Sequence, residues 1–224
     1  MQILTPLREA ELIEAIDSHK TYIRTGGARG EELDLRGTAI PTENQLRTFA
    51  ERFTNYQGAR FRFCSAIGLR APGCDFNLAD LSKGCFHHSD FKNSRFVRAR
   101  LHGTGLEGAD LSGADLRWAD LSCALLHRAT LDGARISFTV GNGREIKNLN
   151  LDAEMPVVYT HDTMAIGHSV ASIEKWEWIS KDFWPGIRDL ENRPAVGDAS
   201  RWMCENLGFI LDTIKRFPAE NPDA

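Results

Sequence analysis

The 224-residue sequence lacks the features that mark several large classes of protein. It has no run of 18 apolar residues, so no membrane-spanning helix is expected, and its first residues lack the pattern of a secretory signal. The five cysteines are an odd number and none are spaced as CxxC, which argues against a disulfide scaffold and a zinc ribbon. We therefore expect a protein of the reducing cytoplasm that needs no cofactor or metal.

Charge of one sign is not in excess, and the motifs of common enzymes are missing. The chain has 27 basic and 31 acidic residues, a formal net charge of -4, which argues against a general nucleic-acid binder. There is no Gly-rich phosphate loop, no GxSxG and no HExxH. His161, Asp162 and His168 are the polar cluster nearest to a catalytic set, and their expected role is turn structure. We expect no enzymatic activity.

A large apolar residue recurs every five positions through the middle of the chain. The series is Phe76, Leu81, Phe86, Phe91, Phe96, Leu101, Leu106, Leu111, Leu116, Leu121, Leu126, Leu131 and Ile136. A small residue stands two positions before each member, from Cys74 to Ala134. A period of five fits neither helix nor strand, so the backbone must turn a corner once in every repeat. Four corners close one coil of four repeats, with both series facing inward and stacked coils bonded as parallel strands.

This pattern resembles the pentapeptide-repeat family, whose motif reads A(D/N)LXX. Residues 109–113 (ADLSG) and 119–122 (ADLS) match the motif directly. The resemblance implies a mainly-β fold, the right-handed quadrilateral β-helix, which we expect over residues 54–140. A coincidentally Ala/Leu-rich helix is the alternative, and the recurrent Gly and Asp residues argue against it.

The residues before the repeat predict a helical N-terminal cap, residues 1–53, that includes a degenerate start of the coil. An amphipathic helix is expected over 6–24, and a second helix over 42–53 would interrupt the coil. The inward residues of the first helix are expected to be Leu12, Ile13, Ile16 and Ile23. Such a cap would cover strand edges at the open end of the coils.

The residues after the repeat, 141–224, predict a small α+β C-terminal domain. A strand pair is expected at 144–151 and 157–166, followed by helices at 171–183 and 198–216. Residues 164–176 also resemble a C-terminal extension of phage and prophage pentapeptide proteins. In that extension a Cys and a His follow MxIG, where this chain has His168 and Ala171.

Residues 20 apart should stack on one face of successive coils, which predicts rows of side chains. The row that we name the Trp118 ridge consists of Leu78, Arg98, Trp118 and Phe138. Three apolar groups at outward positions indicate either a protein-contact surface or a site covered by a terminal element. Another row, Asp75, Arg95, Asp115 and Arg135, alternates in charge and should hold the stack together.

The resemblance also suggests a function, because some members of the family imitate duplex DNA and bind DNA gyrase or topoisomerase. The candidate acidic mimic patch is Asp90, Asp110, Asp115, Asp120 and Asp132. However, residues 54–140 carry 8 acidic and 11 basic groups, so the repeat region is net +3. Its thirteen strict repeats would form roughly 15 Å of rod, which replaces about four or five base pairs.

Two hypotheses of function remain open. The first is a non-enzymatic, possibly phage-encoded, protein-binding solenoid that acts on a type II topoisomerase such as DNA gyrase by partial DNA mimicry. The second is a scaffold or oligomer-building module that binds an unrelated protein through the face carrying Trp118. A homodimer through the tryptophan-rich C-terminal domain would fit either one. Direct nucleic-acid binding by the basic cluster Lys92, Arg95, Arg98 and Arg100 is disfavoured, because two of its arginines are expected to be paired in the charged rows.

Overall fold

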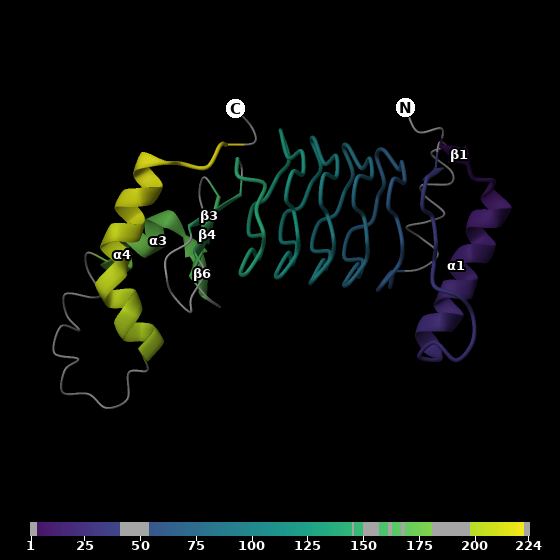
Figure 1. Ribbon diagram of the computed structural model, residues 1–224, viewed down its shortest axis with the longest axis horizontal. Helices are drawn as coiled ribbons and strands as arrows, with labels where there is room; N and C mark the ends of the chain where they lie inside the picture. Colours follow the sequence, from purple (N-terminus) through teal and green to yellow (C-terminus); the bar gives the residue numbers. More distant parts are fainter. Residues whose placement is uncertain are drawn as a thin grey trace.

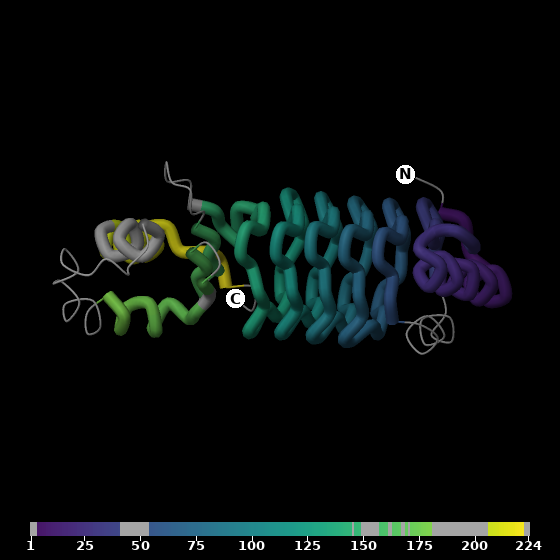
Figure 2. The backbone as a smooth tube through the Cα atoms, turned by 90° about the horizontal axis from the view of Figure 1, so that it is seen from below, coloured from purple at the N-terminus to yellow at the C-terminus, as the bar shows by residue number. Residues whose placement is uncertain are grey.

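The computed structural model describes residues 4–40, 54–144, 146–149, 157–160, 163–166, 169–180 and 198–221. Its centre is a stack of coils with helices at both ends (Figure 1). Parallel bridges join residues 20 apart, from Asn55–Asp75 to Asp120–Val140, so each coil contains four pentapeptides. Seen from below, the coils lie side by side along the long axis of the molecule (Figure 2).

A tight turn follows the large apolar residue of each repeat. At Phe76, the N–H of Ala79 donates to the Phe76 carbonyl at 3.1 Å, and the intervening Leu78 has a φ of +62°. A positive φ at the third residue is what a type II turn requires. Glycine meets this requirement without strain, as at Gly103 with a φ of +63°. The backbone between turns pairs with neighbouring coils, and this alternation produces the period of five.

Both inward series are buried, as the sequence predicts. The thirteen large residues from Phe76 to Ile136 are at most 4% exposed, and the weaker upstream repeats from Tyr56 to Ala71 are equally buried. The aromatic residues gather at the N-terminal end of the stack. Phe76 stacks on Phe96 with ring centroids 5.1 Å apart and on Tyr56 at 5.4 Å. The coil interior is therefore a filled column of side chains.

Two cysteines occupy inward small positions, in agreement with the sequence pattern. Cys64 and Cys74 are each 1% exposed. Burial raises the pKa of the Cys64 thiol to about 12 and that of Cys74 to about 11. Because the thiolate is the reactive form, these two residues act as packing groups. Cys123, in contrast, is exposed at a corner of the coil.

The N-terminal cap is built on helix α1, Glu9–Arg24, which lies beside the first coil (Figure 1). Leu12 and Ile16 are fully buried, as predicted. Ile13 and Ile23 are only half-buried, so the prediction that they face inward is wrong. The buried line of the helix continues instead to His19, because positions 12, 16 and 19 share one face at helical spacing.

The cap also contains the start of the coil. Strand β1, Thr5–Pro6, pairs in parallel with β2, Thr38–Ala39. Asp34 bridges Arg60 and Ala39 bridges Ser65, so these partners are 26 apart in sequence, whereas the other bridges of the stack join residues 20 apart. Six additional residues therefore lie within this coil, which explains why residues 33–40 are out of phase. The predicted helix at 42–53 falls outside the described residues.

His19 connects the cap helix to the coil and predicts a pH dependence of stability. Its Nδ1 accepts the Leu33 N–H at 3.1 Å, and its ring stacks near Tyr22 and Tyr56. Burial lowers the pKa of His19 below the ordinary 6.5, so the unfolded chain binds the proton first as pH falls. We expect constant stability above pH 6.5 and a loss below it, with a slope of up to about 1.4 kcal/mol per pH unit.

Urea unfolding at pH 7.5, 6.5 and 5.5 measures this loss. The His19→Gln variant should be less stable at every pH, because it loses the packed ring, but its stability should fall less between pH 6.5 and 5.5. An identical pH slope in both proteins would contradict this role of His19.

The C-terminal part contains a four-stranded antiparallel sheet in the order β3-β4-β5-β6. Its strands are β3 Lys147–Leu149, β4 Val157–Tyr159, β5 Thr163–Ile166 and β6 Ser169–Ser172. The helices are α3 Ile173–Trp178 and α4 Asp198–Arg216.

The predicted strand pair and the predicted helix 171–183 are therefore wrong in detail. The N–H of Thr160 donates to the Thr163 carbonyl at 2.8 Å, which reverses the chain inside the predicted strand 157–166. The first helix begins later than predicted because Ser172 ends a strand and caps the helix, accepting the Lys175 N–H.

The two faces of this sheet explain how the C-terminal part covers the end of the coil stack. Val158 and Ala165 join the core of the coils, while their neighbours Val157 and Met164 pack in a second core. Alternation along a strand places these pairs on opposite faces. The second core also contains buried residues of α4, namely Leu207, Ile210, Leu211 and Ile214. The sheet thus lies between the coils and α4.

Candidate protein-binding surface

The described residues form neither a membrane span nor a metal centre. Within these ranges, no helix has the length and apolar character needed to cross a bilayer. Nor does any group of three or more His, Cys, Asp or Glu residues there have an arrangement that could hold a metal ion. The polar cluster of His161, Asp162 and His168 falls outside the described residues.

A histidine contact joins two neighbouring coils. His87 Nδ1 contacts the carboxylate of Glu107, one coil away, and Cys85 Sγ lies 3.2 Å from His87 Nε2. This contact links two neighbouring coils, as do the charge contacts of the row that contains Arg95 and Arg135.

The Trp118 ridge is an apolar row that water reaches. Trp118 and Phe138 stack face to face, with ring centroids 4.1 Å apart and an interplanar angle of 2°. The Trp118 side chain is 48% exposed, and Leu78 is 53% exposed. All four members have a positive φ, so each is at the corner of a coil. Within the described parts of the two terminal elements, no residue covers Leu78 or Trp118, although covering was one of the two alternatives left by the sequence.

A hollow lies along the ridge between Leu78 and Trp118. It has a volume of about 350 Å³, and Val97, Arg98 and Arg117 also line it. Arg117 is fixed there by Asp115, which accepts from Nε at 2.7 Å and from Nη2 at 2.6 Å. A two-point pair of this kind orients the guanidinium plane.

Asp115 itself is 8% exposed and also pairs with Arg135 at 3.5 Å. Burial raises the pKa of this carboxyl, but hydrogen bonds and charges from the two arginines outweigh burial and lower its pKa overall. The carboxylate therefore stays ionised and holds Arg117 beside Trp118.

The charged rows predicted from the spacing of 20 form contacts between coils. Arg95 lies 3.7 Å from Asp75 and Arg135 lies 3.5 Å from Asp115, both one coil apart. Exposed pairs of this kind contribute about 0–1 kcal/mol each. Their main effect is to align neighbouring coils.

The five residues of the acidic mimic patch do not form one cluster. Asp90 and Asp110 bridge each other on one side of the stack, while Asp115 and Asp120 lie on the two following sides. Asp110 pairs with Lys92 at 2.9 Å, and Asp120 accepts the Ser122 hydroxyl and N–H. Asp132 is exposed. Lys92 therefore neutralises the charge of Asp110, and Arg117 and Arg135 neutralise that of Asp115.

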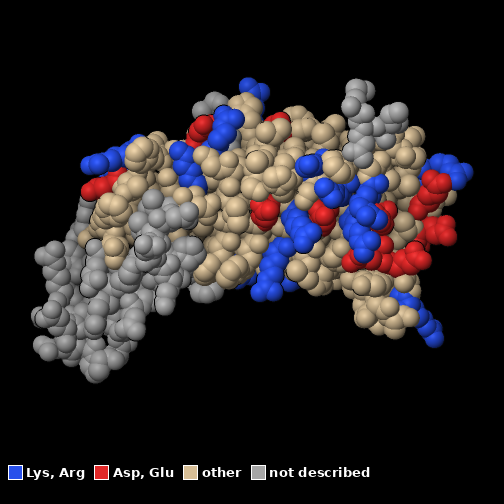
Figure 3. All heavy atoms as spheres, viewed as in Figure 1, with Lys and Arg blue, Asp and Glu red and all other residues tan. Residues whose placement is uncertain are grey.

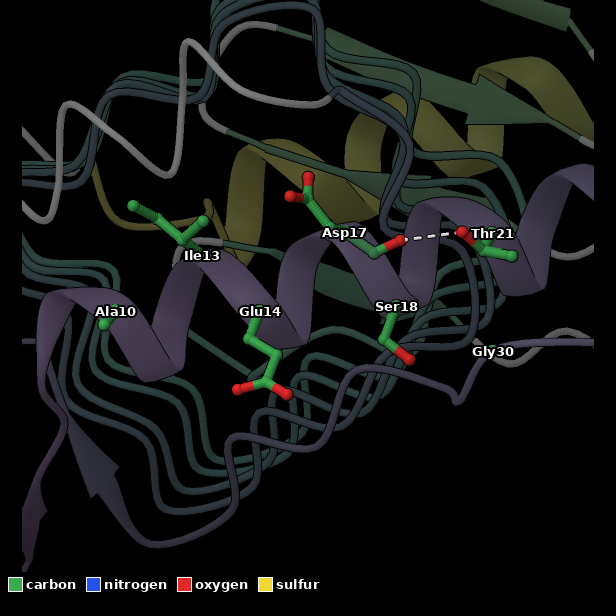
Figure 4. A pocket seen from close by; sticks show the side chains of 7 residues that line it. All are labelled: Ala10, Ile13, Glu14, Asp17, Ser18, Thr21 and Gly30. Carbon is green, nitrogen blue, oxygen red and sulfur yellow. Dashed lines mark hydrogen bonds between the residues drawn. The ribbon is translucent and has the colours of Figure 1, made fainter.

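A shallow pocket on α1 is lined largely by the helix itself (Figure 4). Its hydroxyl groups serve the local fold. Thr21 Oγ1 donates to the Asp17 carbonyl at 3.0 Å, and Ser18 Oγ accepts the Glu31 N–H at 3.0 Å. Glu14 projects from the helix on the same side as Ser18 (Figure 4).

One charged surface was only partly apparent from the sequence, whose basic cluster at 92–100 contributes two of its arginines. Figure 3 shows Lys and Arg side chains gathered over the coils nearer the N-terminus. A groove of about 480 Å³, which we name the arginine groove, contains Arg36, Arg60, Arg62, Arg98 and Arg100. Arg60 and Arg100 are separated by a whole number of 20-residue coils, so the repeat predicts that they lie on the same side. Arg36 does not fit this spacing, because the first coil contains six additional residues. The sequence signal was therefore incomplete.

Comparisons with known proteins agree with this architecture. The model of pentapeptide repeats matches residues 57–96, 74–113 and 109–139, with eight copies. Among curated proteins, none matches this chain.

Three similar solved structures illustrate the likeness. The pentapeptide repeat protein alr5209 of Nostoc PCC 7120 is 26% identical, with 42% of this chain and 74% of that chain covered and a TM-score of 0.32. A pentapeptide repeat protein of the Arabidopsis thaliana thylakoid lumen is 26% identical, with 41% and 57% covered and a TM-score of 0.24. QnrB1, a plasmid-mediated fluoroquinolone resistance protein, is 20% identical, with 47% and 77% covered and a TM-score of 0.24. Residues 57–139 therefore form a region of pentapeptide repeats, and in this region the chain is similar to pentapeptide-repeat proteins.

Proposed function

We propose that this chain is a non-enzymatic protein-binding module whose contact surface is the Trp118 ridge. The observation that carries the proposal is the exposed Trp118, whose ring stacks on the half-buried Phe138. We also propose that the coils have the right-handed quadrilateral form expected from the family.

Three properties of the ridge favour a protein partner. Tryptophan and arginine are the residues that most often dominate the energy of protein contacts, and here Trp118 lies beside Arg98 and Arg117. Arg117 is already fixed by Asp115, so little side-chain entropy would be lost on binding. The coil behind the ridge is a packed column, which gives the partner a rigid surface.

Substitution of Trp118 by Glu tests the ridge. We expect the protein that wild type captures from a lysate of its host, identified by mass spectrometry, to be lost at least tenfold with Trp118→Glu. Leu125→Glu is the matched control, because Leu125 is 51% exposed and lies away from the ridge. Both variants should retain the wild-type unfolding midpoint. Native mass measurements show whether the partner is a second copy. Equal capture by all three proteins would contradict the proposal.

DNA gyrase, bound through partial DNA mimicry, is the second candidate. The observation that favours it is that Asp90 and Asp110 lie on the same side of neighbouring coils, joined by a backbone bridge. A supercoiling assay, with and without quinolone, distinguishes the two candidates. Inhibition or protection at micromolar protein that is lost with Asp90→Asn and Asp110→Asn would establish mimicry. No effect on gyrase, together with capture of a different partner through Trp118, would exclude it.

A further inference from the structure

The arginine groove is a local concentration of positive charge on a chain whose net charge is -4. It contains five arginines, against the two acidic residues Glu32 and Asp80. Arg60, Asp80 and Arg100 follow one another in consecutive coils, and bridges between their backbones fix their alignment. The groove is therefore part of the coil stack rather than of a separate loop.

The arginines differ in how far the protein itself uses them. Arg36 pairs with Asp34 at 2.5 Å and Arg60 pairs with Glu32 at 2.7 Å. Arg98 and Arg100 form no ion pair within the part of the chain that the structure describes, and both are exposed. These two guanidinium groups are consequently available to a ligand.

Arg98 and Arg100 are close neighbours on the outside of one coil. The inward Ala99 separates them, so both side chains leave the coil from adjacent outward positions. Each guanidinium can bind a carboxylate or a phosphate through two parallel hydrogen bonds. The site therefore fits a ligand that carries at least two anionic groups.

The surroundings favour a protein ligand over a nucleic acid. Leu78 lines both the arginine groove and the hollow beside Trp118, which makes the groove continuous with the Trp118 ridge. Leu78 at the edge of the groove can contact an apolar side chain of a ligand that also carries carboxylates.

We propose that the arginine groove binds a short acidic segment of the partner protein, with Arg98 and Arg100 holding its carboxylates and Leu78 contacting an apolar side chain. The inference rests on the proposed function, because it assumes that the partner is a protein. It adds the chemistry by which that partner is recognised. Charge attraction of this kind raises the association rate and weakens as salt increases.

Fluorescence anisotropy with the full chain and labelled probes tests this proposal. The probes are a 12-residue Asp/Glu peptide with one Leu, its Asn/Gln counterpart, and a 12-nucleotide single strand of DNA. At 50 mM salt we expect the acidic peptide to bind at least tenfold tighter than the amide counterpart and the DNA. Its affinity should fall as salt is raised to 200 mM.

Charge reversal locates the site. Arg98→Glu with Arg100→Glu should weaken the acidic peptide at least tenfold, and the milder Arg98→Gln with Arg100→Gln should also weaken it. Arg70→Glu with Arg128→Glu is the matched control, since both residues are exposed and the change in net charge is the same. That control should bind within about twofold of wild type in the same salt.

The outcomes separate this inference from the proposed function. The inference is overturned if the acidic peptide binds no tighter than its amide counterpart, if both charge reversals weaken it equally, or if the DNA binds tighter through Arg98 and Arg100. If the captured partner is nevertheless lost with Trp118→Glu, the proposal that the Trp118 ridge is a contact surface would still stand. Conversely, peptide binding through Arg98 and Arg100 with capture unaffected by Trp118→Glu would support the groove and refute the ridge.

Discussion

Phe76→Ala is expected to lower the free energy of unfolding by about 3–5 kcal/mol. Phe76 is 1% exposed and contacts four other rings, since it stacks on Tyr56 and Phe96 and meets Phe61 and Phe91 edge to face. The coils above and below are fixed by backbone hydrogen bonds, so they cannot collapse into the cavity. The loss therefore includes both the burial of the ring and the cavity left behind.

Guanidinium unfolding followed by circular dichroism measures this effect. The control is Leu78→Ala, at the adjacent corner, where the side chain is 53% exposed and the change should remain within about 0.5 kcal/mol. Leu111→Ala, at an inward position without ring contacts, should cost about 2–5 kcal/mol. Similar small losses at Phe76 and Leu78 would show that the inward assignment is wrong.

The coil was predictable because its determinants are local. Each repeat supplies its own inward Leu or Phe, its own small residue and its own corner, so the pattern can be followed residue by residue from Phe76 to Ile136. The same spacing of four repeats placed Trp118 beside Phe138. The spacing did not predict whether the Trp118 ridge is exposed, because its exposure depends on where the terminal elements lie.

The remaining parts depended on contacts between distant residues. On α1 the apolar Ile13 is only half-buried, whereas the polar His19 is buried. The hydrophobicity of a residue therefore does not predict its burial here, because the coil beneath the helix selects the buried face. The turn at Thr160 interrupts an apolar run that reads as a single strand. The arginine groove combines Arg36 with Arg98 across a lengthened first coil, and no single period relates them.

The second large effect is expected for a disulfide between corners of adjacent coils. Cys123 is exposed at a corner with a φ of +58°, and Gly103 occupies the same corner one coil earlier with a φ of +63°. The Gly103 N–H donates to the Ser122 carbonyl at 2.8 Å, so the two segments lie side by side. Coil spacing of about 4.8 Å is within the Cα separation of about 4.4–6.8 Å that a disulfide accepts.

Gly133→Cys is the matched control. Gly133 is also a corner glycine, with a φ of +67°, and a Cβ there would meet no atom within 4 Å. At Gly103 an added Cβ would come no closer than 3.6 Å to Lys83. Both variants therefore place an accessible thiol at a corner. They differ in position, because residue 133 is half a coil away from Cys123.

Mild oxidation of these two variants, followed by proteolysis and mass spectrometry, tests the winding of the chain on which the ridge and the groove depend. We predict that Gly103→Cys becomes linked to Cys123 in most molecules and that Gly133→Cys does not. Equal linkage of both variants to Cys123, or no linkage of a freely labelled Cys at position 103, would contradict a coil that returns to the same corner after every four repeats.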